Sequence, residues 1–415
     1  MSPTPRLAVA LAVVAVLTAV LGTAFGVLAV LLLAGAAVAD LLAIRAAPRA
    51  RRTVPAILAR GVRAPLTIAV ELDGPGTVRV RQPVPPDLGL EPREAEGGLD
   101  ATLVPLRRGR HTLGAVALRR EGPLGLARTH HRAGEAQEVL VYPDLPAARR
   151  LALAVRSGRF REQGRLTRGP LGLGTDFESI RDYAPDDDIR QVNWRATQRL
   201  QRPMSNQFRV EQDREVMLLV DGGRLMSAPL GDRTRLDAAI DAAVAVALVA
   251  DVVGDRAGTV AFDRVLRRRL SPRRAGGDAV VRALFDLEPR AEEPDYEQAF
   301  RTVEGAKRSL ILIFTDLLEE AAARPLVDAV PVLARRHAVI VASATDPDLD
   351  ALVRAQPRAP RDVYAGGVAL EVLAARARVA HQLQATGARV VEAPAGALGA
   401  ACVRAYLTAK AAARL

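Results

Sequence analysis

The sequence predicts an α/β protein, in which a parallel sheet follows a small β-rich domain and an apolar N-terminal helical hairpin. Three observations predict this fold. Residues 7–39 carry no charge, residues 53–148 contain short extended runs separated by glycine and proline, and residues 215–415 alternate apolar strands with helices. Continuous apolar strands between helices are typical of a parallel sheet covered on both faces. A chain of 415 residues has room for two or three such domains.

The composition excludes several classes of protein. Hydrophobic residues make up 49% of the chain and charged residues 25%, which are the proportions of a globular protein. The single cysteine, Cys402, excludes an intrachain disulfide and a zinc site built on cysteines. The net charge is +11, but aromatic residues are only 3% and do not interleave with the basic ones as in nucleic-acid-binding surfaces. We therefore expect no nucleic-acid partner.

The uncharged segment 7–39 is predicted to form a membrane hairpin. As one helix it would be about 50 Å long, well beyond the roughly 30 Å hydrocarbon core of a bilayer. We expect two arms, Leu7–Leu21 and Ala24–Ile44, with a turn at Gly22-Thr23. A secretory signal cleaved after Ala39 is one alternative, although its apolar region would be unusually long. A buried soluble hairpin is another, although neither arm has a polar face.

Arginines on both sides of the hairpin predict its orientation. Arg6 precedes the first arm, and the second is followed by Arg45, Arg49, Arg51, Arg52, Arg60 and Arg63. Positively charged flanks stay on the cytoplasmic side of a membrane. We therefore expect residues 1–52 to anchor the chain in the inner (cytoplasmic) membrane, with both ends of the hairpin and the soluble part in the cytoplasm.

Residues 53–148 are predicted to form a small β-sandwich-like domain. Leu66–Leu72 alternates apolar and polar residues, and Asp73-Gly74-Pro75-Gly76 is a turn signal. The expected strands are Leu66–Leu72, Thr77–Val80, Ala101–Leu106, His111–Leu118 and Val139–Tyr142. Short antiparallel strands at this spacing are typical of a sandwich.

Residues 215–415 are predicted to form the parallel sheet with its helices. The expected strands are Val216–Val220, Ala257–Phe262, Val265–Leu270, Leu310–Phe314, Ala338–Ala342 and Val390–Ala393. The expected helices are Thr234–Ala250, Ala279–Leu287, Tyr296–Ala306, a long one around Val363–Thr386, and Ala400–Ala413. Ligands of such sheets bind at the carboxyl ends of the strands, where Asp221 and Asp316 are placed.

Asp221 and Asp316 are candidate ligands of Mg²⁺, which prefers oxygen donors. Their arrangement resembles the metal-ion-dependent adhesion site of von Willebrand factor A domains, which begins D-x-S-x-S. Here Gly223 and Leu225 replace both serines, and Glu293–Tyr296 brings no hydroxyl where a threonine is expected. We expect a degenerate metal site that requires no cofactor and binds Mg²⁺ weakly, if at all. Alternatively, both aspartates cap the helices that follow them.

Residues 149–214 mix arginines with acidic residues and contain the only tryptophan. The core of this segment resembles the DUF58 family of bacterial proteins. The residues that fit the family pattern are Phe177, Ile180, Arg181, Tyr183, Asp187, Arg190, Val192, Asn193, Trp194 and Arg199. Asp186 stands where the family usually has glycine. We expect the segment to dock on the neighbouring α/β domain through arginine–carboxylate pairs, with Tyr183 and Trp194 as core residues of the junction.

The resemblance implies a von Willebrand A-like, doubly wound domain at residues 215–415 and a role in protein assembly or maturation. Members of the family look like partners of MoxR-type AAA+ ATPases and are often encoded beside them. The implied binding residues are Arg181, Tyr183, Asp187, Arg190, Asn193, Trp194 and Arg199. By this resemblance the chain would bind a protein partner.

The sequence contains no catalytic motif. It has neither a Walker A pattern nor a G-x-S-x-G elbow. We therefore expect a membrane-anchored, non-enzymatic adaptor or scaffold. A metal-dependent enzyme at the Asp221/Asp316 crevice is the main alternative, and an extracytoplasmic adhesion-like protein is a third.

Overall fold

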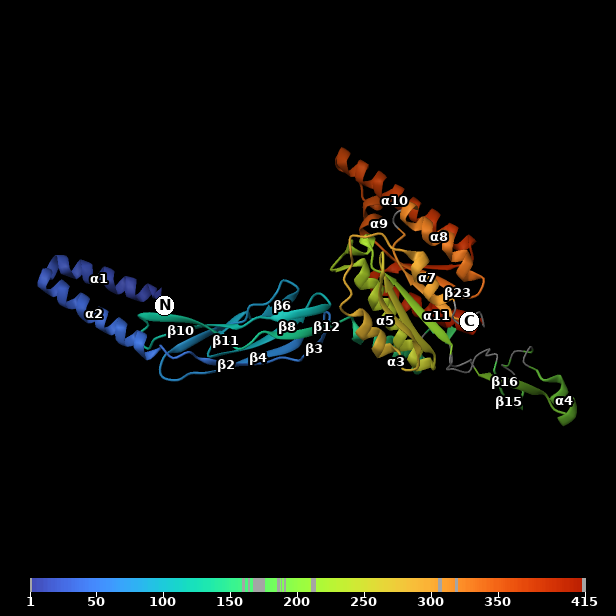
Figure 1. The fold of residues 1–415 in the computed structure, drawn as a ribbon, viewed down its shortest axis with the longest axis horizontal. Helices are drawn as coiled ribbons and strands as arrows, with labels where there is room; N and C mark the ends of the chain where they lie inside the picture. The colour runs from blue at the N-terminus through green and yellow to red at the C-terminus, as the bar shows by residue number, and fades with distance from the viewer. Residues whose placement is uncertain are drawn as a thin grey trace. The chain divides into compact units, whose positions relative to one another are not determined.

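The structure is a computed structural model that describes residues 2–158, 161–162, 165–166, 176–184, 187, 189, 192–209, 214–304, 308–317 and 320–412. The chain divides into two compact units, Met1–Tyr142 and Pro143–Leu415. The first unit combines two helices with β-sheets, and the second contains a six-stranded sheet with helices (Figure 1). Each unit is described by itself.

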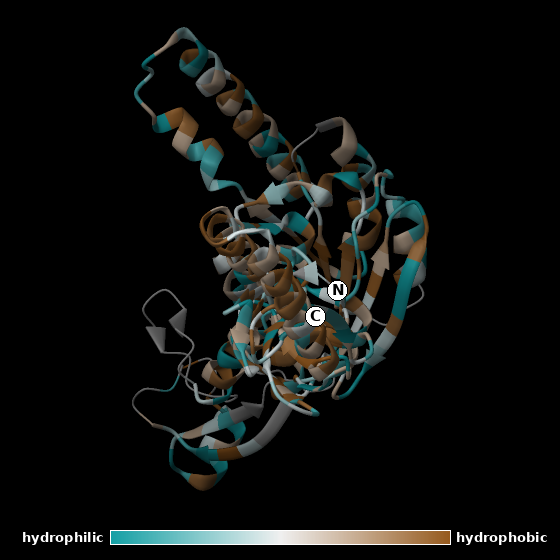
Figure 2. Cartoon of the chain, turned by 90° about the vertical axis from the view of Figure 1, so that its left-hand side faces the viewer, coloured by the Kyte–Doolittle hydropathy of each residue, from teal (hydrophilic) through white to brown (hydrophobic). Residues whose placement is uncertain are grey.

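Two apolar helices begin the first unit, α1 (Pro5–Leu21) and α2 (Thr23–Ala43). They are joined at Gly22, whose φ of 92° is a left-handed conformation that favours glycine. They pack together where Gly26 faces Thr18, because a Cβ at Gly26 would lie 2.4 Å from the Thr18 side chain. With 21 residues and high hydropathy, α2 is long and apolar enough to cross a membrane, whereas α1 is shorter. Figure 2 looks along both helices from their junction and shows their largely hydrophobic surface.

Short strands make up the rest of the first unit. They are β1 (Ser2–Pro3), β2 (Arg49–Thr53), β3 (Ile57–Ala59), β4 (Ala64–Glu71), β5 (Thr77–Arg81), β6 (Leu88–Glu91), β7 (Glu94–Glu96), β8 (Gly98–Pro105), β9 (Gly109–Leu113), β10 (Val116–Glu121), β11 (Ala127–Ala133) and β12 (Gln137–Tyr142). They form three sheets, in the orders β1-β11-β10-β5-β7, β2-β4-β8-β6 and β3-β12-β9. Apolar side chains of all three sheets share one core, which includes Ile68, Val80 and Leu118.

The strands expected at residues 66–72, 77–80, 101–106 and 139–142 are present with shifted ends. The single strand expected at 111–118 is wrong, because two strands, β9 and β10, occupy that stretch and pair with different neighbours. Gly114-Ala115 separates them. A glycine inside an extended pattern often marks such a break.

One six-stranded sheet organises the second unit, in the order β21-β20-β17-β22-β23-β24. Its strands are β17 (Glu215–Asp221), β20 (Arg256–Phe262), β21 (Leu266–Arg273), β22 (Leu310–Phe314), β23 (Ala338–Thr345) and β24 (Arg389–Pro394). All pairs are parallel except β20–β21, which places an antiparallel strand at one edge. The parallel sheet and all six expected strands are confirmed, and β22 has the bounds predicted from its apolar run.

Helices accompany this sheet. They are α3 (Leu145–Arg156), α5 (Arg235–Val253), α6 (Gly277–Leu284), α7 (Tyr296–Glu304), α8 (Glu320–Ala334), α9 (Pro347–Arg354), α10 (Pro360–Ala385) and α11 (Ala395–Ala411), with a 3₁₀ turn, η2, at Arg224–Ser227. Side chains of α7, α8 and α10 share a core with one face of the strands, while α5 and α11 pack together and against the strands. The sequence pattern did not predict α8, because Pro325 and Pro331 lie inside this helix and proline normally interrupts a helix.

The segment before the sheet carries a small lobe. It contains β15 (Asp176–Asp182), α4 (Trp194–Leu200) and β16 (Met204–Arg209), and β15 pairs antiparallel with β16. The same segment contains the paired short strands β13 (Arg161–Glu162) and β14 (Arg165–Leu166). Within the sheet domain, β18 (Pro229–Leu230) and β19 (Arg233–Thr234) pair with each other between η2 and α5.

Candidate functional site

Neighbouring strands bring the two predicted aspartates to one edge of the six-stranded sheet. Asp221 is the last residue of β17, and Asp316 follows β22. The strands are parallel neighbours, with Val220 paired to Phe314, so their carboxyl ends lie side by side. Both aspartates are buried, with exposed fractions of 3% and 5%.

Asp221 is held by three hydrogen bonds. Its Oδ1 accepts from the N–H of Gly223 at 2.7 Å, and its Oδ2 accepts from the hydroxyls of Thr315 at 2.7 Å and Tyr296 at 3.1 Å. Burial raises the pKa of Asp221 to about 6, although the three donors oppose this shift. A buried carboxyl group at the sheet edge therefore changes its charge close to neutral pH.

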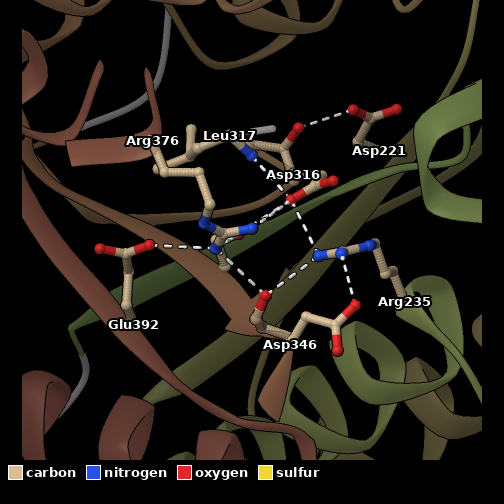
Figure 3. Close-up of polar contacts among 10 residues, drawn as sticks. Asp221, Arg235, Asp316, Leu317, Asp346, Arg376 and Glu392 are labelled. Carbon is tan, nitrogen blue, oxygen red and sulfur yellow. Dashed lines mark hydrogen bonds and ion pairs between the residues drawn. The ribbon is translucent and has the colours of Figure 1, made fainter. Parts of the chain in front are cut away.

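Asp316 lies between two buried arginines (Figure 3). Its Oδ1 accepts from Nη1 of Arg235 and from Nη1 of Arg376, each at 3.1 Å, and from the N–H of Leu317 at 2.9 Å. Burial raises the pKa of Asp316, while the two guanidinium groups act in the opposite direction. Arg235 opens α5 and Arg376 lies within α10, so two helices close over the end of β22.

The two arginines also reach further carboxylates. Nη2 of Arg376 donates to Glu392 at 3.0 Å and to the carbonyl oxygen of Ala344 at 3.2 Å. Nη2 of Arg235 lies 3.6 Å from Oδ2 of Asp346. Figure 3 shows the two arginines reaching Asp316 from separate elements, with Glu392 beside Arg376 and Asp346 beside Arg235. The result is a buried ion-pair network that ties α5, α10, β23 and β24 to the end of β22.

The residues at this edge do not fit a divalent cation. Guanidinium groups supply positive charge beside Asp316, and both oxygens of Asp221 already accept hydrogen bonds. A Cβ at Gly223 would lie 2.9 Å from the carbonyl oxygen of Glu292, which leaves no room for the missing serine. Within the described residues, Oδ2 of Asp316 is buried without a partner, and no three acidic, histidine or cysteine side chains gather as a metal site. Mg²⁺ needs six oxygen ligands in near-octahedral geometry.

Two expectations about this edge need correction. The expectation that Glu293–Tyr296 brings no hydroxyl to the place of the usual threonine is wrong, because the phenol of Tyr296 donates to Asp221. The helix-capping alternative is wrong for Asp221, because the cap residue of η2 is Gly223, without a side-chain cap. Asp221 instead forms a tight turn with the backbone of that glycine.

Most of the described polar residues of the predicted motif lie in the framework of the small lobe. Asp187 accepts from the N–H of Ala184 and pairs with Arg181, and both contacts lower the pKa of Asp187. The hydroxyl of Tyr183 donates to the backbone oxygen of Asp187 at 3.2 Å. These contacts fix the turn that follows β15.

Asn193 starts the helix of the lobe. Its Oδ1 accepts from the N–H of Ala196 as an N-cap, and its Nδ2 donates to Oδ1 of Asn206 on β16 at 2.8 Å. Capping of this kind typically contributes about 1 kcal/mol to helix stability. The helix α4 and the strand β16 are thereby tied together.

Trp194 corrects the prediction of a buried aromatic junction. It is the first residue of α4 and 68% of its surface is exposed, so the prediction that it is a core residue is wrong. Tyr183 is half-buried, and Arg199 is exposed with Trp194 on α4. Arg190 lies outside the described residues. The motif thus places polar residues in the lobe's framework and Trp194 at its surface.

Sequence reasoning missed four residues at the sheet edge, namely Arg235, Tyr296, Thr315 and Arg376. Arg235 and Arg376 lie 81 and 60 residues from Asp316 along the chain, so no local spacing connects them. One signal in the sequence could have found Arg235, which is the first residue of the nearly all-apolar helix α5. An arginine in such a buried helix is normally paired with a carboxylate.

A comparison with protein families gives a match. The family described as protein of unknown function DUF58 matches residues 179–389, which covers the lobe from β15 onward and the sheet as far as the start of β24. A comparison with curated proteins gives no match. The matched region is half of the chain and contains the lobe motif from Ile180 onward and the ion pairs of Asp316 with Arg235 and Arg376, and the chain therefore belongs to the DUF58 family.

Proposed function

We propose that the chain is a membrane-anchored adaptor that binds a protein partner and is not itself an enzyme. The observation that carries this proposal is the exposed Trp194 on a helix whose position is fixed by hydrogen bonds. Binding hot spots are enriched in tryptophan and arginine, and exposed arginines accompany Trp194 on α4 at positions 195 and 199. The anchored lobe would offer a preformed surface to a partner.

The partner that the family resemblance favours is a MoxR-type AAA+ ATPase. In this proposal the 215–415 domain is a von Willebrand A-like, doubly wound interaction module. Five parallel strands with helices on the sheet support that assignment. The client process would be assembly or maturation of another protein.

The buried ion pairs support a non-enzymatic, metal-independent function. Asp316 is neutralised by Arg235 and Arg376 rather than left open for a cation. An enzyme at this edge would need a ligand or nucleophile that reaches solvent, and all three side chains are at most 5% exposed. We therefore propose that partner binding needs no Mg²⁺ at Asp221 and Asp316.

The anchor in this proposal is a hairpin of α1 and α2 in the inner membrane. The basic flanks at Arg6 and at Arg45–Arg52 favour the cytoplasm for both ends of the hairpin and for the soluble part. We expect a fluorescent protein fused after Leu415 to fluoresce, and an alkaline phosphatase fused there to be inactive. An active phosphatase would reverse the proposed topology.

Replacing Trp194 with alanine tests the adaptor function. We expect Trp194→Ala to weaken binding of the MoxR-type ATPase about 30-fold, the effect of losing a hot spot of about 2 kcal/mol. The melting temperature should hardly change, since exposed substitutions usually alter stability by less than about 0.5 kcal/mol. The measurement is biolayer interferometry with the full chain in nanodiscs.

Tyr364→Ala is the matched control, because Tyr364 is an aromatic residue with 77% exposure on α10. It should leave the affinity unchanged. If the wild type and Trp194→Ala bind the ATPase with equal affinity, the proposal that the partner binds the lobe through Trp194 is wrong.

A further inference from the structure

A buried aspartate fastens the end of α2 to the β-domain. Asp40 is 1% exposed although it lies in the last turn of an apolar helix. Its Oδ1 accepts from the N–H of Leu124 at 2.9 Å, and its Oδ2 accepts from the N–H groups of Leu126 at 2.8 Å and Ala127 at 2.9 Å. Leu124 and Leu126 belong to the turn between β10 and β11, which we call the 122–126 turn, and Ala127 is the first residue of β11.

The start of α1 is fastened to the same turn. Thr4 is the N-cap of α1. Its hydroxyl donates to the carbonyl oxygen of Gly125 at 2.5 Å, and its backbone N–H donates to the carbonyl oxygen of Leu126 at 3.3 Å. Residues Ser2–Pro3 then pair with β11 as the short strand β1. The 122–126 turn therefore lies at the level where one helix begins and the other ends.

The close packing leaves little freedom at this junction. A Cβ at Gly122 would lie 2.1 Å from Oδ1 of Asp40, and a Cβ at Gly125 would lie 2.6 Å from Nη1 of Arg6. Arg120, fully buried, donates to the carbonyl oxygens of Ala46 and of the loop at residues 73–75. The turn and the two helix ends are therefore closely packed and hydrogen-bonded to one another.

The turn presents an apolar side chain beside the apolar surface of α2. Leu124 is 54% exposed, and on α2 Val38 and Leu42 are 56% and 58% exposed, on either side of Asp40 in sequence. The apolar surface of α2 thus continues past the level at which Asp40 holds Leu124. Arg6 and Arg45 are exposed at the same level and suit the phosphates of lipid headgroups.

We propose that the 122–126 turn is a further membrane contact, with Leu124 inserted into the interfacial layer and Arg6 and Arg45 on anionic headgroups. The proposal rests on the proposed membrane insertion of α2. It assigns Asp40 as a positioning residue that sets the depth of the β-domain at the bilayer surface. A second copy of the chain or a partner protein covering Leu124 is the competing occupant.

Single tryptophans measure this depth in the full chain. The only native tryptophan is removed by Trp194→Phe, and Leu124→Trp is introduced in that background. The protein is reconstituted in vesicles of phosphatidylcholine and phosphatidylglycerol whose chains are brominated near the carbonyl end. Bromine quenches tryptophan only at short range. We expect strong quenching and a blue-shifted emission for Leu124→Trp.

Two further variants separate the possible failures. Leu106→Trp is the matched surface control, because Leu106 is 53% exposed and follows β8 at the end of the β-domain remote from α2, where Leu103 pairs with Ala64. It should not be quenched. Leu31→Trp reports α2 itself, is 64% exposed, and should be quenched by lipids brominated near the chain end.

The outcomes are distinct. Quenching at position 31 without quenching at position 124 overturns the inference and leaves the membrane anchor intact. If the emission at position 124 is blue-shifted but not quenched, a protein covers Leu124 instead of lipid, and the inference is also overturned. No quenching at position 31 contradicts the anchor itself. In the Asp40→Asn variant, which lacks one carboxylate oxygen, we expect the quenching at 124 to fall toward that at 106 while position 31 is unchanged. Unaltered quenching at 124 would remove Asp40 as the positioning residue.

Discussion

Replacing Arg376 with methionine is expected to lower the free energy of unfolding of the sheet by about 3–5 kcal/mol, the usual cost of breaking a buried ion pair. Arg376 is 3% exposed and pairs with Asp316 and Glu392. Without it, Asp316 keeps a single guanidinium partner, that of Arg235. Hydrogen exchange of the β22 amides measures the loss, because exchange of a central strand reports the opening of the sheet.

Arg378→Met is the matched control, because Arg378 is exposed on the same helix. It should change exchange at β22 little. Adding Asp316→Asn to Arg376→Met should recover part of the loss, because the uncompensated charge is removed. If Mg²⁺ alone restores the stability of Arg376→Met, the edge of the sheet accepts a cation and the metal-independent account is wrong.

The contribution of Asp221 to the stability of the second unit is expected to fall as the pH rises from about 4 to about 6. The pKa of Asp221 is about 6 in the folded chain, raised by burial from an ordinary value of 3.8. The folded state therefore keeps the proton of Asp221 over a pH range in which the unfolded state has lost it. The stabilising contribution of this proton is fully present below about pH 4 and is lost as the pH rises through the folded pKa. The loss amounts to about 3 kcal/mol.

Asp221→Asn should remove this contribution. Asparagine cannot ionise, and its carbonyl oxygen still accepts from the N–H of Gly223. The pKa of Asp316 is also raised, so a contribution of the same sign remains in the variant. Urea unfolding of both proteins between pH 4 and 8, followed by circular dichroism, gives the difference. Parallel stability curves for the two proteins would show that Asp221 does not titrate in this range.

Much of the second unit could be predicted from its apolar runs. A buried parallel strand is apolar on both faces, so Leu310–Phe314 defined β22 without ambiguity. The neighbourhood of Asp221 and Asp316 followed from the topology, because parallel strands end at the same edge of the sheet. These inferences depend only on local sequence and on a general rule of α/β sheets.

The partners of those aspartates could not be predicted in the same way. Arg235 and Arg376 belong to helices far from Asp316 in sequence, and only the packed fold brings their guanidinium groups together. Similarly, a lone aspartate at the end of an apolar helix gives no indication that Asp40 accepts hydrogen bonds from the 122–126 turn. Long-range polar contacts carry no period in the sequence.

The error at Trp194 has a different physical origin. A single tryptophan in a segment poor in apolar residues was expected to be buried, because large aromatic side chains dominate cores. The lobe is instead held by Asn193, Asp187 and their backbone partners, which leaves the indole at the surface. Exposed tryptophans on fixed helices are typical of binding sites, and the same residue therefore supports the adaptor function.

The most direct test of the adaptor function is a crosslink from the lobe in living cells. A photoreactive benzophenone amino acid replaces Trp194 in the full chain, and Tyr364 carries it in a matched control. We predict a crosslink from position 194 to a AAA+ ATPase of the MoxR type, and none from position 364, irrespective of mutations at Asp221. If no protein crosslinks to position 194 in a chain that is folded and membrane-bound, the proposal that the lobe binds a protein partner is contradicted.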